Sequence, residues 1–176
     1  MRIAAGRWKG RTLEIPASAR PTSSRAREAL FDILGPRIAG ARVLDLFAGS
    51  GAIGFEAVSR GAARAVLVDP DAEALRRAQT ALGAGKDVLV MASDAARAVA
   101  DLGRRGERFD VVFADPPYRD GGRAMRDLSG VALLLSPDGV LVVQTDSEEK
   151  PPSLEGFAPF SSRGYGRNVF HFLRIL

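Results

Sequence analysis

The chain has 176 residues, of which 46% are hydrophobic, and it contains one histidine and no cysteine. This length suits one domain with a sizeable core. The composition excludes disulfides, thiolate metal sites and multi-histidine metal sites, and His171 lies in a predicted strand, where a structural role is favoured over catalysis. No apolar run is long enough for a bilayer and no apolar signal core follows Met1, so we expect a cytoplasmic, metal-free protein.

Positive charge is concentrated at the N-terminus. Residues 1 to 27 hold seven basic side chains and one acidic one, whereas the whole chain has a net charge of +4, so the remainder is net negative. This distribution predicts that residues 1 to 22 form a basic arm that grips a polyanion such as RNA. A solvated segment without a partner is the alternative. The expected RNA contacts are Arg7, Lys9, Arg11, Arg20, Arg25 and Arg27.

The predicted elements alternate between strands and helices. Residues 1–16 predict a short β-hairpin with Gly6 and Gly10 at its turns. Apolar residues at helical spacing predict a helix that is capped by Ser23 or Ser24 and ends at Gly35. Strands are predicted from residue 43 and at 65–68, 88–92, 109–114, 140–145, 157–162 and 168–175, and helices up to residue 60 and at 71–82, 95–102 and 123–135.

This alternation predicts an α/β fold with a doubly wound, mostly parallel sheet over residues 23–176. The strand at 168–175 is expected to be antiparallel. Ligands of such sheets bind outside the carboxyl ends of the strands. Four acids fall at these ends, which predicts a site there: Asp45, Asp69, Asp94 and Asp115.

A glycine motif, G-x-G-x-x-G, follows the first parallel strand at Gly49, Gly51 and Gly54. Such a loop lets a ligand approach backbone N–H groups at a helix start, and it occurs in dinucleotide enzymes and in S-adenosylmethionine (SAM) enzymes. Asp45 favours SAM, because a carboxylate repels a pyrophosphate and attracts the ammonium group of a methionine moiety. The alternative role for Asp45 is to tether amides of the loop.

Two further acids are placed to bind the nucleoside part of the cofactor. Asp69 follows Gly49 by 20 residues, a spacing that suits a carboxylate accepting both ribose hydroxyls in either cofactor class. Asp94 is placed to accept a hydrogen bond from an adenine amino group, or to cap the helix that begins at Ala95.

The sharpest motif is Asp-Pro-Pro-Tyr at residues 115–118. Two prolines fix φ and remove two backbone donors, so the segment presents rigid acceptors. The Asp115 carboxylate and the Pro116 carbonyl could hold both hydrogens of an aromatic amine and direct the nitrogen lone pair at a sulfonium methyl. Tyr118 offers a face on which an extruded base can stack. A structural turn is the alternative.

Together these motifs resemble the class I amino-methyltransferases. The N-terminal Arg-Ile-x-x-Gly-Arg-Trp-Lys-Gly-Arg, then Arg20-Pro21-Thr22 and Arg25-x-Arg27-Glu28-x-Leu30-Phe31, narrow the resemblance to the RsmD family, which methylates N2 of one guanine in bacterial 16S rRNA with SAM. The likeness runs from Arg2 to the Tyr165-Gly166 segment. Ser23-Ser24 in place of Thr-Asp, and Asp69 in place of Glu, depart from the usual pattern.

The resemblance implies a Rossmann-like, seven-stranded sheet with helices on both faces, preceded by the N-terminal hairpin and helix. It implies a monomer that acts on 16S rRNA within the small ribosomal subunit or its assembly intermediate. The target base is assigned to Asp115, Pro116, Pro117 and Tyr118, and SAM to Asp45, Phe47, Gly49, Ser50, Gly51, Asp69, Asp94 and Ala95. Open alternatives are a DNA adenine-N6 or other amino-methyltransferase, a nucleotide-dependent oxidoreductase, which Asp45 opposes, and a non-catalytic RNA-binding module.

Overall fold

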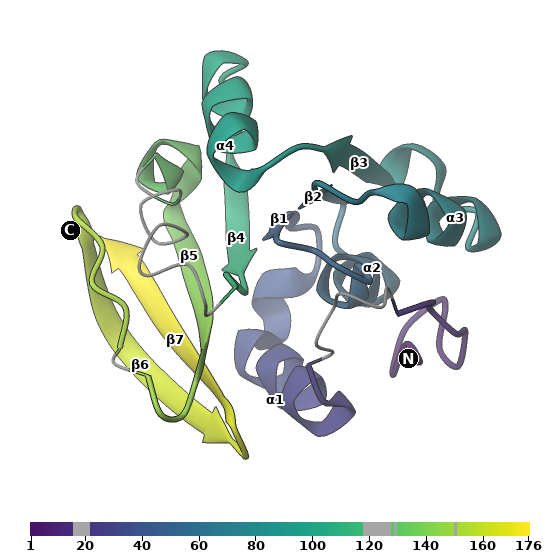
Figure 1. Ribbon diagram of the computed structural model, residues 1–176, viewed down its shortest axis with the longest axis horizontal. Coiled ribbons are helices and arrows are strands. Elements are labelled where there is room, and N and C mark those ends of the chain that lie inside the picture. The colour runs from purple at the N-terminus through teal and green to yellow at the C-terminus, as the bar shows by residue number, and fades with distance from the viewer. Residues whose placement is uncertain (16–21, 118–127, 129, 150) are drawn as a thin grey trace.

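A computed structural model describes residues 1–15, 22–117, 128, 130–149 and 151–176. Seven strands form one sheet in the order β3-β2-β1-β4-β5-β7-β6. The neighbours from β3 to β5 are parallel, and β7 pairs antiparallel with both β5 and β6. Figure 1 shows the long β6–β7 pair at one edge of the sheet and β3 at the other. The predicted mostly parallel, seven-stranded α/β fold is therefore confirmed.

The elements follow the predicted order, and the predicted bounds of 88–92 and 109–114 are confirmed. The strands are β1 Arg42–Leu46, β2 Arg64–Asp69, β3 Val88–Ala92, β4 Phe109–Ala114, β5 Leu135–Asp146, β6 Phe157–Tyr165 and β7 Asn168–Ile175. The helices are α1 Ser24–Leu34, α2 Ala52–Ser59, α3 Glu73–Ala81 and α4 Ala95–Arg104, with 3-10 turns η1 Gly35–Ile38, η2 Gly85–Asp87 and η3 Val131–Leu134.

Each face of the sheet has its own hydrophobic core. Successive residues of a strand point to opposite faces, so Val43 packs with α1 and α2 on one side while Leu44 packs with α4 and η3 on the other. Both residues are at most 1% exposed. Figure 1 shows α1 and α2 on one side of β1 and α4 on the opposite side. Burial of both faces holds the strand ends in fixed positions.

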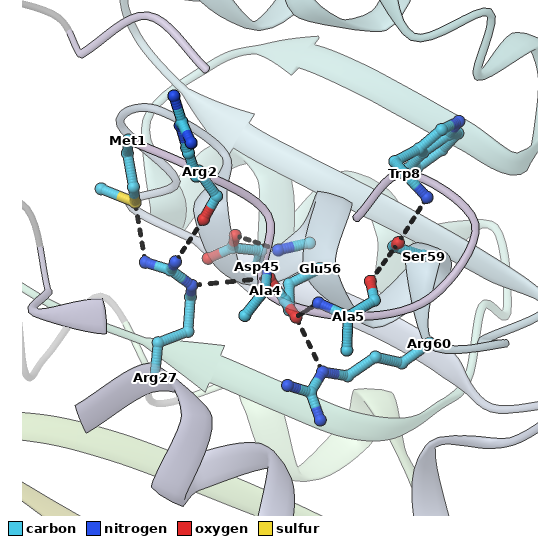
Figure 2. A network of polar contacts seen from close by, with 11 residues as sticks. Met1, Arg2, Ala4, Ala5, Trp8, Arg27, Asp45, Glu56, Ser59 and Arg60 are labelled. Carbon is cyan, nitrogen blue, oxygen red and sulfur yellow. Dashed lines mark hydrogen bonds and ion pairs between the residues drawn. The ribbon is translucent and has the colours of Figure 1, made fainter. Parts of the chain in front are cut away.

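The predicted N-terminal β-hairpin is not formed as two strands. A single antiparallel bridge joins Arg2 to Thr12, and the backbone between them turns toward α2. The amides of Ala4 and Ala5 donate to the Glu56 carboxylate, and that of Trp8 donates to the Ser59 hydroxyl (Figure 2). These amides bind α2 and are therefore not available for a cross-strand ladder. The segment 1–13 forms a closed loop fastened to α2, which we call the N-terminal loop.

Gly6 makes this close packing possible. Its φ is +81°, and a Cβ at this position would lie 1.7 Å from the Ser59 carbonyl oxygen. The N-terminal loop also buries Ile3, Trp8 and Leu13 in the same core cluster as α1 and α2. The N-terminal loop therefore packs into the same hydrophobic core as α1, α2 and one face of the sheet. The role of residues 1 to 22 as a basic RNA-binding arm stays a prediction.

Two other predictions differ from the structure. The fifth strand was predicted at 140–145, but β5 begins at Leu135 and runs through Pro137, Asp138 and Gly139, with an irregular register between the Phe109–Leu135 and Val111–Val140 pairs. The proline is tolerated there because the ladder is interrupted at the irregularity. Residues 123–127 and 129 of the helix predicted at 123–135 lie outside the described residues, whereas residues 131–134 form the 3-10 turn η3 and Leu135 already begins β5.

Candidate active site at the carboxyl ends of the parallel strands

The glycine loop leaves β1 in an unusual backbone conformation. Phe47 has φ +62° and is the one non-glycine residue with positive φ in the described part of the chain. Gly49 and Gly51 have φ +53° and +73°, and Gly51 is the N-cap of α2. Left-handed backbone at a β-branched or bulky residue such as Phe47 is costly and is concentrated at functional sites. The loop thus has the strained shape of a ligand-binding turn that leads into the start of a helix.

The Asp45 carboxylate lies beneath this loop. It is 1% exposed, and its Oδ2 accepts a 3.0 Å hydrogen bond from the Gly54 amide. Burial raises the pKa of Asp45 to about 7, against the effect of this hydrogen bond, and the charges of Asp115 and Asp69 raise it further. The alternative role that we considered, a tether for amides of the loop, is present at one amide of the glycine motif, that of Gly54 in α2. A contact with a ligand ammonium group stays a prediction, and such a cation would favour the charged carboxylate.

Gly54 keeps α2 close to the sheet. A Cβ there would lie 2.6 Å from Cδ1 of Leu67 on β2, so a larger residue would force the helix away. Ser50, in the loop itself, is buried at 7% exposure. The third glycine of the motif therefore serves helix–strand packing, and the first two shape the loop.

Asp69 connects the end of β2 to the glycine loop. Its Oδ2 accepts from the Gly49 amide at 2.8 Å, and its Oδ1 accepts from the Asp71 amide at 2.9 Å. The residue is partly exposed. The structure thus brings Asp69, which is predicted to bind the ribose, into direct contact with the glycine loop, which is predicted to bind a phosphate or a carboxylate.

Asp94 caps α4. Its Oδ1 accepts from the Arg97 amide at 2.8 Å, and Ala95, the first residue of the helix, is 3% exposed. The capping role considered for Asp94 is confirmed, and contact with an adenine stays a prediction. The neighbouring Ser93 amide donates to the Asp69 carbonyl, so the end of β3 lies beside that of β2.

Asp115 follows β4 at the same edge of the sheet. It is half-buried, and its Oδ2 accepts a 3.2 Å hydrogen bond from Nε2 of Gln144 on β5. Pro116 is buried and Pro117 is exposed. Tyr118, the predicted stacking residue, lies outside the described residues. The ends of β1, β2, β3 and β4 therefore present the four predicted acids along one edge.

Our sequence analysis missed the polar neighbours of Asp115. Gln144 also donates to Oδ1 of Asn168 at 3.2 Å and accepts from the Thr22 hydroxyl at 3.1 Å. The available signal was the polar Gln144 directly after the apolar run Val140-Leu-Val-Val, since a buried amide requires partners. Its particular partners lie far away in sequence and could not be inferred from spacing.

The structure corrects one predicted RNA contact. Arg27 is 1% exposed on the inner face of α1, where its Nη2 donates to the Arg2 carbonyl and its Nε lies 3.6 Å from Glu56 (Figure 2). A side chain in the core cannot reach a phosphate, so Arg27 has a structural role. Helical spacing places it with Leu30 and Leu34 on the buried face.

The other described residues that were predicted to contact RNA have positions compatible with RNA binding. Arg7, Lys9, Arg11 and Arg25 are exposed, and Arg20 lies outside the described residues. Arg7 pairs with Asp87 at 2.9 Å and its guanidinium lies over the Trp8 ring. Three of the exposed bases therefore belong to the N-terminal loop, which holds their backbone in place.

His171 has the structural role that we expected. It is 4% exposed, and its ring nitrogens lie 2.9 Å from the hydroxyls of Thr145 and Ser162. Burial lowers its pKa. Among the described residues, no cluster of three or more His, Asp or Glu side chains is arranged to hold a metal. In the same residues, no helix has the length and apolar character to cross a membrane.

The strand order, with a glycine loop after β1 and acids at the ends of β1 to β4, defines the Rossmann-like methyltransferase class. The chain belongs to the RsmD family of methyltransferases, described as Conserved hypothetical protein 95, whose profile matches residues 1–174.

Individual relatives agree with this assignment. The chain is 32% identical, over 85% of its length and 80% of the relative, to Ribosomal RNA small subunit methyltransferase D of Haemophilus influenzae. It is 43% identical to the Escherichia coli protein of that name, over 69% of the chain and 62% of the relative. The solved structure of hypothetical protein TTHA0928 of Thermus thermophilus matches 98% of both chains, with a TM-score of 0.83 and 36% identity.

Proposed function

We propose that the protein transfers a methyl group from SAM to the exocyclic N2 amine of a guanine in 16S rRNA. The observation that carries the proposal is the position of Asp115 at the end of β4, on the edge that also holds the strained glycine loop and Asp69. The small-subunit rRNA is proposed as the substrate because two relatives are named Ribosomal RNA small subunit methyltransferase D. We also propose that the protein acts as a cytoplasmic monomer on the small ribosomal subunit or its assembly intermediate.

The residues at the strand ends fit SAM. Backbone amides at the start of α2 suit its carboxylate, Asp45 suits its ammonium group, and Asp69 suits its ribose. Bound SAM supplies an electrophilic methyl group. The role of Asp115 and the Pro116 carbonyl is then to hold the two amine hydrogens so that the nitrogen lone pair points at that methyl.

Labelled SAM tests this function directly. The protein is incubated with naked 16S rRNA, small subunits, and DNA, and the modified base is mapped by mass spectrometry. Label on a guanine N2 in the rRNA or the subunit supports the proposal. Label on a DNA adenine supports the alternative amino-methyltransferase. RNA binding with no transfer to any substrate supports the non-catalytic alternative.

Replacing Asp69 by alanine should weaken SAM binding by about 1.5–3 kcal/mol, the usual magnitude for hydrogen bonds to a charged group. Part of this loss arises because the Gly49 amide loses its acceptor. Isothermal titration calorimetry measures the effect, and Asp138→Ala, an exposed acid at the opposite end of the sheet, is the control. Unchanged SAM affinity, or tighter binding of NAD than of SAM, would contradict the cofactor assignment.

The basic side chains of the N-terminal loop and of the start of α1 should make RNA affinity depend steeply on salt. Each phosphate contact contributes about −0.7 to −0.9 to the log–log slope of affinity against salt. The double change Lys9→Gln and Arg25→Gln should reduce the slope by about 1.4–1.8 and leave SAM affinity unchanged. Substitution is preferable to deleting the loop, because deletion also removes Ile3, Trp8 and Leu13 from the core.

Fluorescence anisotropy with labelled 16S rRNA fragments measures these slopes between low and moderate salt. Arg104→Gln is the matched control, since Arg104 is an exposed base at the end of α4 that pairs with Asp101. A wild-type affinity that does not change with salt, or an equal effect of the control, would contradict the electrostatic interface.

A further inference from the structure

Gln144 links the candidate catalytic carboxylate to two distant parts of the chain. It is 3% exposed on β5, and its amide nitrogen donates to Oδ2 of Asp115 and to Oδ1 of Asn168, both at 3.2 Å. Its amide oxygen accepts from the hydroxyl of Thr22, which is 9% exposed and directly precedes the Ser23 cap of α1. The contacts join the ends of β4, β5 and β7 to the start of α1.

The chemistry of the partners sets the direction of every hydrogen bond. A charged carboxylate only accepts, so the amide must present its NH2 group to Asp115. Its carbonyl then faces Thr22, which can only satisfy it by donating the hydroxyl proton. The donors therefore point in series from Thr22 through Gln144 to Asp115. Hydrogen bonds in such a series polarise one another in the same sense.

The register of the sheet explains why Gln144 occupies this position. Ala114 of β4 pairs with Val143 of β5, so the next residues, Asp115 and Gln144, lie side by side at the strand ends. On the other side β5 is antiparallel to β7, and Asp146 pairs with Asn168, which brings the first residue of β7 to the same edge. Gln144 itself pairs with Phe170 of β7, and the preceding residue, Val143, pairs with β4, so both neighbouring strands fix this part of β5.

We propose that Gln144 is a positioning residue that orients the Asp115 carboxylate for methyl transfer, and that Thr22 orients Gln144; this inference rests on the proposed function. A buried neutral amide donates a directed hydrogen bond without bringing a positive charge that would pair with the carboxylate. The hydrogen bond from the strand beside it thus sets the plane of the Asp115 carboxylate. Asp45 on β1 also interacts electrostatically with Asp115, and this interaction is repulsive when both are charged.

Two variants and a matched control test the inference. Gln144→Met has nearly the same volume and removes all three hydrogen bonds, and Thr22→Val removes the hydroxyl while keeping the shape. The control is Thr145→Val, the same isosteric change at the next residue of β5. Thr145 is also buried, at 5% exposure, but its hydroxyl contacts His171 and not Gln144.

Single-turnover methyl transfer to small-subunit rRNA at saturating SAM is the measurement, with SAM affinity and the KM for RNA determined alongside. Gln144→Met should lower the rate about 10- to 100-fold and Thr22→Val about 2- to 10-fold, as expected for hydrogen bonds to charged and neutral groups. SAM affinity and KM should stay within about twofold of wild type, and Thr145→Val should leave the rate within the same margin.

A purely structural role predicts a different pattern. If Thr22→Val and Thr145→Val lower melting temperature and rate equally, or if Gln144→Met keeps a wild-type rate, the inference is wrong while the proposed function stands. If Gln144→Met fails to fold, the comparison of the two Thr→Val variants decides. If the wild-type protein binds SAM but methylates no rRNA, the proposed function is wrong, and the inference about Gln144, which rests on it, is wrong as well.

Discussion

Replacing Asp115 by alanine should lower the single-turnover rate of methyl transfer by about 10²–10⁴-fold while SAM affinity stays nearly unchanged. The magnitude is that of losing a group that positions or exchanges a proton with the reacting atom. SAM affinity is spared because the expected SAM contacts come from β1, the glycine loop and the ends of β2 and β3, whereas Asp115 follows β4. Rapid-quench assays with labelled SAM measure the rate, and calorimetry measures the affinity.

The conservative variant Asp115→Asn tests whether Asp115 positions the amine or acts as a base that removes its proton. Asp115→Asn keeps one acceptor oxygen and should retain more activity than Asp115→Ala, because the amine becomes acidic only after methyl transfer begins. If Asp115 serves only a structural turn, activity and melting temperature should fall in parallel in both variants. Near-normal transfer by a stable Asp115→Ala variant would end the catalytic assignment.

Replacing Glu56 by glutamine should destabilise the protein by about 3–5 kcal/mol, the usual cost of removing one member of a buried ion pair. Glu56 is 0% exposed, and its carboxylate accepts from the amides of Ala4 and Ala5 and from Nε of Arg60 at 2.8 Å (Figure 2). Arg27, 3.6 Å away, would be left as a buried charge without its partner, and burial already lowers its pKa. Chemical denaturation measures the loss.

A double-mutant cycle identifies the cause. Arg27→Met should cost less than Glu56→Gln, because Glu56 keeps Arg60 and the two loop amides, whereas Nε of Arg27 has no hydrogen-bond partner among the described residues. The double variant should be more stable than the sum of the two losses predicts, since it leaves no unpaired arginine at this position in the core. Amide exchange at Ala4 and Ala5 should accelerate in Glu56→Gln. Additive losses with unchanged exchange would show that Glu56 does not hold the N-terminal loop.

The sequence by itself determined the order of elements and the nature of the site. The strands at 88–92 and 109–114 were located by short apolar runs, and the acids at strand ends by their positions after those runs. Such local patterns carry this information because side-chain periodicity and the restricted dihedrals of glycine and proline act within a few residues. The parallel sheet then follows from the alternation of strands and helices.

Only the tertiary structure decided which polar groups are buried together. Arg27 has the sequence character of a surface base, yet Glu56 on another helix and the N-terminal loop enclose it. The N-terminal loop had the pattern of a hairpin, but its amides bind α2, because Glu56 and Ser59 offer acceptors and Gly6 allows close approach. Gln144 likewise meets Thr22 and Asp115 only through the sheet. In each case the partner is far away in sequence, and the free energy of burying a polar group depends on that partner.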